Sequence, residues 1–209
     1  MEMFTYALLT TVLAMVAVQN LYLMVGLAAV QALLLGAEAA WIGWQHGDTA
    51  LYWAAALTVA IKAVVIPLFL RYIIRRIGVI HILDSTLTVK VTLLIAIGLT
   101  FVAHYATGAL AEVGGIESEA LAAALTLVLI GAFLMVSRRV ALTQVLGLLV
   151  MENGLFLAAL ATTRGLPLLV DVGIFFDVLV GALVMGLMIY RINATFESID
   201  TSKLRRLQG

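Results

Sequence analysis

Three ionisable side chains lie inside long apolar stretches of the sequence, namely Lys62, Glu152 and Asp177. The nearest basic residues toward one edge of the membrane are, in the same order, Arg71, Arg139 and Arg191. At about 1.5 Å of rise per helical residue, the three groups lie about 13, 20 and 21 Å from those residues, near the middle of a bilayer. A charge at that depth costs about 2.5–3.5 kcal/mol on insertion scales and by default indicates function.

Burial favours the neutral form of each of these groups, whereas a nearby opposite charge favours the charged form. A lysine and two carboxylates at one depth therefore predict a proton relay through Lys62, Glu152 and Asp177. The alternative is a static ion pair that only fixes helix packing. The sequence does not show that the three side chains touch.

Three further residues are candidates around this group. Glu38 and His104 lie in the outer halves of their predicted helices and could extend the path to the exterior, or could simply hydrogen-bond or reach the interface. Pro67 removes a backbone hydrogen bond five residues after Lys62 and is expected to kink that helix. A carbonyl freed there needs water or a side chain. Pro67 therefore predicts either a hydrated break or a plain packing kink.

The composition excludes an ordinary soluble domain. Of the 209 residues, 64% are hydrophobic and 11% are charged, against about 45–50% and 25% in soluble domains. Lys plus Arg equals Asp plus Glu, which gives no support for nucleic-acid binding. The chain has no cysteine, which excludes disulfides and cysteine-ligated iron–sulfur clusters. No residue set indicates a metal, a phosphate loop or a nucleophile–base site.

The apolar runs predict an all-α polytopic membrane protein, because spanning the hydrocarbon core takes about 20 apolar residues. We expect about seven transmembrane helices, and we expect the chain to be one transmembrane domain, 1–209. The expected helices are 4–18, 21–45, 50–75, 87–110, 119–137, 140–163 and 168–192. The break at Gln19-Asn20 is the weakest, and one continuous helix there would leave six spans. The cytoplasmic tail, 193–209, is too short to fold alone.

The basic residues predict the orientation, since cytoplasmic loops are rich in Lys and Arg. Ten of them fall on one side of the seven-helix arrangement and Arg164 alone on the other. The ten are Arg71, Arg75, Arg76, Lys90, Arg138, Arg139, Arg191, Lys203, Arg205 and Arg206. The N-terminus is therefore expected outside and the C-terminus in the cytoplasm.

Several motifs resemble the hydrogenase-4 component E family, the membrane subunits of energy-converting hydrogenase and formate hydrogenlyase complexes. They are Ile61-Lys62 to Pro67-Leu68, Ser137-Arg138-Arg139, Met151-Glu152-Asn153-Gly154, Asp171 to Asp177 and the ending Asp200 to Gly209. The resemblance is strongest after residue 60.

The three-helix region 119–192 is similar to the K-type subunit of complex I and the C subunit of Mrp antiporters, whereas the four-helix region 1–110 has no counterpart there. Asp177 matches the position of the third-helix glutamate of the K-type subunit. The second-helix glutamate aligns near Leu149, whereas this chain carries Glu152 three residues later on the same helical face.

The resemblance implies an accessory membrane subunit of a complex I-related, ion-translocating redox complex in a prokaryotic cytoplasmic (inner) membrane. Expected partners are antiporter-like subunits, a membrane connector subunit, and a soluble redox arm docked through the tail. Iron–sulfur clusters, and nickel–iron if the complex is a hydrogenase, are expected on those partners, so this chain performs no redox catalysis itself. The alternatives are a structural adaptor and, less favoured, a stand-alone transporter. The electron donor and the choice between protons and sodium stay open.

Overall fold

The computed structural model describes residues 2–77, 87–111, 118–138 and 140–163, and these residues form helices with no β-strand. The predicted helix 168–192, with Asp177, and the tail 193–209 lie outside the described residues. The elements are α1 (Glu2–Ala17), α2 (Leu21–His46), α3 (Thr49–Thr58), η1 (Val59–Val65), α4 (Ile66–Ile77), α5 (Val89–Ala111), α6 (Ser118–Ser137) and α7 (Ala141–Thr163). The element η1 is a π-helix within the third predicted span.

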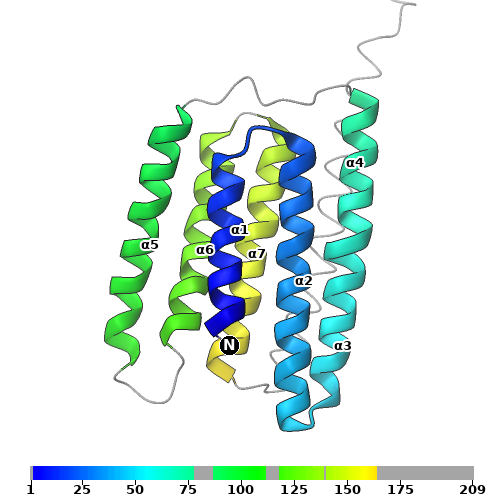
Figure 1. The fold of residues 1–209 in the computed structure, drawn as a ribbon, viewed down its shortest axis with the longest axis vertical. Coiled ribbons are helices and arrows are strands. Elements are labelled where there is room, and N and C mark those ends of the chain that lie inside the picture. The colour runs from blue at the N-terminus through cyan, green and yellow to red at the C-terminus, as the bar shows by residue number, and fades with distance from the viewer. Residues whose placement is uncertain (1, 78–86, 112–117, 139, 164–209) are drawn as a thin grey trace, which may run out of the picture.

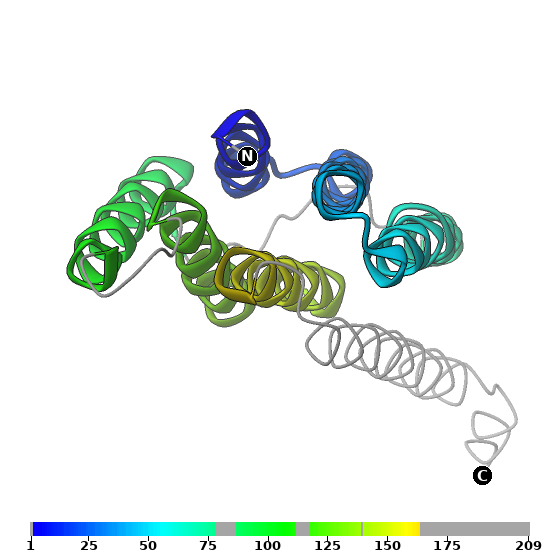
Figure 2. The same ribbon diagram turned by 90° about the horizontal axis from the view of Figure 1, so that it is seen from below.

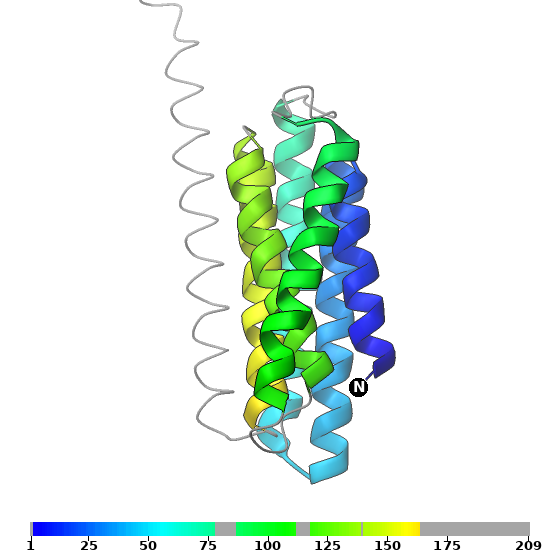
Figure 3. The ribbon, with the colours of Figure 1, turned by 90° about the vertical axis from the view of Figure 1, so that its left-hand side faces the viewer.

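The helices run alongside one another and form two layers (Figures 1 and 2). One layer holds α1, α2 and the continuous helix α3–η1–α4, and the other holds α5, α6 and α7. Apolar side chains from both layers form one buried core. Within the described residues, α5 packs mainly beside α6 and also contacts α1 of the first layer (Figures 2 and 3).

Five helical segments of the described residues are long and apolar enough to cross a membrane, which identifies a multi-pass membrane protein. They are Leu21–His46, Thr49–Arg75, Val89–Gly108, Ser118–Ser137 and Ala141–Thr162. The apolar helix Met3–Ala17 is shorter.

The chain reverses direction between α1 and α2, so one continuous helix at this point is excluded. Asn20 begins α2 by accepting hydrogen bonds from the backbone N–H groups of Tyr22, at 2.9 Å, and Leu23, at 3.3 Å. Asparagine is among the preferred residues at this capping position. The two helices then pack side by side in opposite directions (Figure 1).

Glycine sets the spacing between α6 and α7, which form the most extensive helix–helix contact of the bundle described here. A Cβ atom at Gly131 would lie 2.6 Å from the backbone nitrogen of Met151 and 2.7 Å from the carbonyl oxygen of Gly147. Small residues allow membrane helices to approach this closely. The pairing places Glu152 and Asn153 of α7 at a fixed height in the core.

Arg138, between α6 and α7, ties this pair to α1. Its side chain is 2% exposed, and Nη2 donates a hydrogen bond of 3.1 Å to the carbonyl oxygen of Val16 in the last turn of α1. Burial lowers the pKa of the Arg138 guanidinium from its usual value, yet an arginine side chain keeps its proton in proteins. A cation at a helix C-terminus also interacts favourably with the helix dipole.

We expect Arg138→Leu to loosen α1 from the bundle. Hydrogen bonds to charged groups contribute about 1.5–3 kcal/mol, which corresponds to a fall in the thermal midpoint of roughly 3–12 °C at about 2–4 °C per kcal/mol. Thermal unfolding of the purified chain in detergent measures this fall in the midpoint. The matched control is Arg75→Leu, because Arg75 is exposed. Equal midpoints for the two variants would contradict the anchoring role.

Candidate functional site: a buried ion pair at mid-depth

Lys62 lies at the centre of η1, five residues before Pro67. Proline has no backbone N–H and its ring clashes with the carbonyl four residues earlier, so residue 67 cannot make the α-helical hydrogen bond to Ala63. The chain widens instead: Ile66 donates its N–H to the carbonyl of Ile61, five residues back. Such π-helical turns are frequent at functional sites. The expected kink therefore takes the form of a widened turn that carries Lys62.

Lys62 and Glu152 form an ion pair, with 3.2 Å between Nζ and Oε1. Their side chains are only 3% and 5% exposed. The Nζ atom also lies 5.8 Å from the centre of the Phe156 ring, within the range of a cation–π interaction. Two of the three predicted relay residues are thus in direct contact, although they are far apart in sequence.

A chain of hydrogen bonds continues from Lys62 across the bundle. Lys62 Nζ donates to Asn153 Oδ1 at 3.2 Å, and Asn153 Nδ2 donates to Gln31 Oε1 at 3.0 Å. Gln31 Nε2 then donates to Thr11 Oγ1 at 3.3 Å, and the Thr11 hydroxyl donates to the carbonyl of Leu8 at 2.7 Å. The side chains come from η1, α7, α2 and α1, so the pair is connected to both layers.

The aromatic and basic residues agree with a mid-depth position for Lys62. All three tryptophans, Trp41, Trp44 and Trp53, are exposed near the α2–α3 connection, and tryptophan is enriched at membrane–water interfaces. At about 1.5 Å per residue, Lys62 lies about 13 Å from Trp53 and about 13 Å from Arg71. These two distances together nearly match a hydrocarbon core of about 30 Å.

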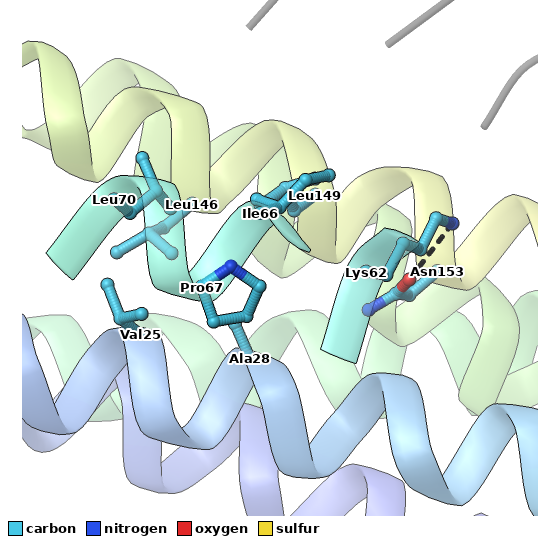
Figure 4. A pocket seen from close by; sticks show the side chains of 9 residues that line it. All are labelled: Val25, Ala28, Lys62, Ile66, Pro67, Leu70, Leu146, Leu149 and Asn153. Atoms are coloured by element: carbon cyan, nitrogen blue, oxygen red, sulfur yellow. Dashed lines mark hydrogen bonds between the residues drawn. The ribbon is translucent and has the colours of Figure 1, made fainter. Parts of the chain in front are cut away.

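A small cavity lies beside Lys62, on the side of Pro67 and Leu70 (Figure 4). The space open to the centre of a water molecule is about 10 Å³, close to the roughly 10–15 Å³ that one water needs. Lys62 and Asn153 are the polar side chains among its walls. The lining residues are Val25, Ala28, Lys62, Ile66, Pro67, Leu70, Leu146, Leu149 and Asn153.

The other three predicted residues lie on α2, on α5 and outside the described residues. Glu38 is 0% exposed, on α2 about two turns beyond Gln31 toward the tryptophan end. His104 is on the exposed face of α5, so the described residues do not connect it to the pair. Asp177 lies outside the described residues.

Three side chains of the site were not predicted from the sequence: Gln31, Thr11 and Phe156. The sequence does contain a signal for Gln31, because it is an amide in the middle of an apolar helix. Polar side chains in the membrane commonly form hydrogen bonds with another helix. Asn153 was noted only as a member of the Glu-Asn-Gly motif. In the portion of the chain that the structure describes, no three His, Cys, Asp or Glu side chains are grouped to hold a metal ion.

Comparisons with known proteins give one informative relative. The uncharacterized protein Rv0085 of Mycobacterium tuberculosis is 33% identical over 195 residues, which is 91% of this chain and 87% of the relative. No family model and no solved structure matches the chain. The extent of the match to the relative shows that the chain belongs to the family of Rv0085.

Proposed function

We propose that this protein is an accessory membrane subunit of a complex I-related, ion-translocating redox complex of the hydrogenase-4 or formate hydrogenlyase type. The observation that carries the proposal is the Lys62–Glu152 ion pair, buried at mid-depth of a helix bundle. Ionisable residues inside a membrane bundle mark ion paths and proton relays. Lys62, Glu152 and Asp177 form the mid-depth segment of the proton or sodium path, and Glu38 extends it outward.

In this proposal the chain has seven transmembrane helices, with the N-terminus outside and the C-terminus in the cytoplasm of a prokaryote. Support comes from the basic residues Arg71 and Arg75 of α4 and Arg138 of the α6–α7 connection. The C-terminal end of α4 and this connection lie at the same end of the described bundle (Figure 1). Positive charges favour the cytoplasmic side. The tryptophans lie at the opposite end.

The partners that we propose are an antiporter-like subunit, a membrane connector subunit and a soluble redox arm that docks on the tail. Those partners hold the iron–sulfur clusters and any nickel–iron centre. The chain contributes a path for ions between the connector and the antiporter-like subunits. This portion of the proposal depends on the resemblance of the Lys62 and Glu152 segments to hydrogenase-4 component E.

A structural adaptor is the second candidate, and the hydrogen-bond chain from Lys62 to Leu8 favours it. A fully bonded polar network makes a core rigid and specific. Such a network could hold the two layers together without moving an ion. The adaptor and the relay differ in what happens when the charge of Glu152 is removed but its shape is kept.

We expect Glu152→Gln to reduce ion translocation at least tenfold while the complex assembles and still transfers electrons, because glutamine cannot bind and release a proton. Asp177→Asn is expected to act in the same way. The measurement is ion translocation and electron transfer by the intact complex in vesicles. Glu119→Gln is the matched control, since Glu119 is exposed at the start of α6. Full translocation in both path variants would refute the relay, and loss of assembly would favour the adaptor.

A further inference from the structure

All four hydrogen bonds that lead away from Lys62 point in the same direction. The ammonium group can only donate, so Asn153 must turn its oxygen toward Lys62 and its NH₂ toward Gln31. At the far end the carbonyl of Leu8 can only accept, so the Thr11 hydroxyl donates there and its oxygen accepts from Gln31. The two ends thus fix both amide orientations.

This series of hydrogen bonds does not carry protons, because the amides of Asn153 and Gln31 do not exchange protons as acids or bases at ordinary pH. What it supplies is electrostatic. The negative end of the Asn153 dipole lies on the Lys62 ammonium, and each further bond polarises the one before it. The effective dielectric of a buried site strengthens such interactions relative to water.

The alternative for a buried pair is neutralisation. Burial disfavours both charges, so a proton of Lys62 could pass to Glu152 and leave two neutral side chains. Glu152 lies on one side of the ammonium group, and Asn153 and Phe156 add further stabilisation to the charged form. The carboxylic acid of α2, Glu38, is buried about two turns along the helix from Gln31.

We propose that Thr11, Gln31 and Asn153 are positioning residues that keep Lys62 a fixed cation, so that Glu152 is the member of the pair that binds and releases the transported proton. When Glu152 takes a proton from the path, its carboxylate becomes a carboxylic acid and the Lys62 ammonium stays intact. When it gives the proton on, the ion pair forms again. The use of that proton rests on the function proposed above, whereas the charge state of the pair does not.

Infrared spectroscopy of the purified full-length chain in nanodiscs at neutral pH tests the charge state. A protonated carboxyl group has its own C=O band, and its loss in Glu152→Gln assigns the band to Glu152. We expect no such band in the native chain, a clear band in Lys62→Met, and at least about half of that intensity in Gln31→Leu. The band is expected to be absent in the double variant Gln31→Leu/Lys62→Arg, because arginine cannot give up its proton.

Thr126→Val is the matched control, since Thr126 is also buried and its hydroxyl also bonds a carbonyl of its own helix, at 2.8 Å. Thr11→Val removes only the hydroxyl that accepts from Gln31. It is expected to give a weaker band of the same kind. This second variant provides the test if Gln31→Leu does not fold. The proposal is overturned if Gln31→Leu and Thr11→Val match Thr126→Val, or if the band persists in the arginine double variant. Neither result depends on partner subunits, so failure here is distinct from failure of translocation in Glu152→Gln.

Discussion

Replacing Lys62 with methionine is expected to destabilise the protein more than any other single change at the site. The substitution leaves Glu152 buried without its 3.2 Å partner, so that its carboxyl group must take up a proton, and it removes the donor to Asn153. Breaking a buried pair by removing one member costs about 3–5 kcal/mol, or roughly 6–20 °C in the thermal midpoint. Thermal unfolding in detergent at neutral pH gives the value.

The double variant Lys62→Met/Glu152→Leu separates a lost charge partner from lost packing. Replacing a whole buried pair with apolar residues is often neutral or stabilising. Here the Asn153 carbonyl still loses its donor, which costs about 1–3 kcal/mol. We therefore expect the double variant to be more stable than Lys62→Met. A double variant that is less stable than the single one would mean that the two side chains do not interact as a pair.

Gly131→Leu is expected to force α6 and α7 apart. Its Cβ alone would lie 2.6 Å from the Met151 nitrogen, which is backbone and cannot swing away as a side chain could. Overpacking costs about 1–3 kcal/mol and occasionally more, and a leucine at this contact should reach or exceed the upper end. The same thermal assay measures the loss. Because α7 carries Glu152, the variant should also weaken the ion pair.

Gly98→Leu is the control for the change of residue type. A Cβ at Gly98, on α5, meets nothing within 4 Å, and leucine is a better helix former than glycine by up to about 1 kcal/mol. We expect Gly98→Leu to leave the thermal midpoint unchanged or slightly raised. A similar fall in the thermal midpoint of both variants would show that the effect of Gly131→Leu does not come from the α6–α7 contact.

The apolar runs and the basic clusters were sufficient to predict a helical membrane protein, because span length and charge placement are imposed by the bilayer rather than by detailed packing. The same depth argument singled out Lys62 and Glu152, and the structure brings them together at 3.2 Å. Their contact itself was not predictable. It depends on how α7 is placed against η1, and nothing local in either segment encodes that placement.

The amide partners were harder to predict for the same reason. Gln31 and Thr11 belong to the site only because α1 folds back on α2 and lies within reach of α7. Periodicity shows that a helix is apolar, but it does not show which face meets which neighbour. His104 stays a prediction: its depth suggests a path, and the structure shows its side chain exposed on α5.

The equal spacing of Lys62 from Trp53 and Arg71 has an electrical consequence for the proposed relay. A group halfway through the hydrocarbon core lies at about half of the membrane potential. Moving one charge across the whole membrane involves about 2.3 kcal/mol per 100 mV, so a proton that reaches Glu152 from either side crosses about 1.2 kcal/mol of it. That is roughly 0.8 pH unit per 100 mV. A change of 100 mV in the membrane voltage would therefore alter the proton occupancy of Glu152 about as much as a change of roughly 0.8 pH unit on the side from which the proton enters.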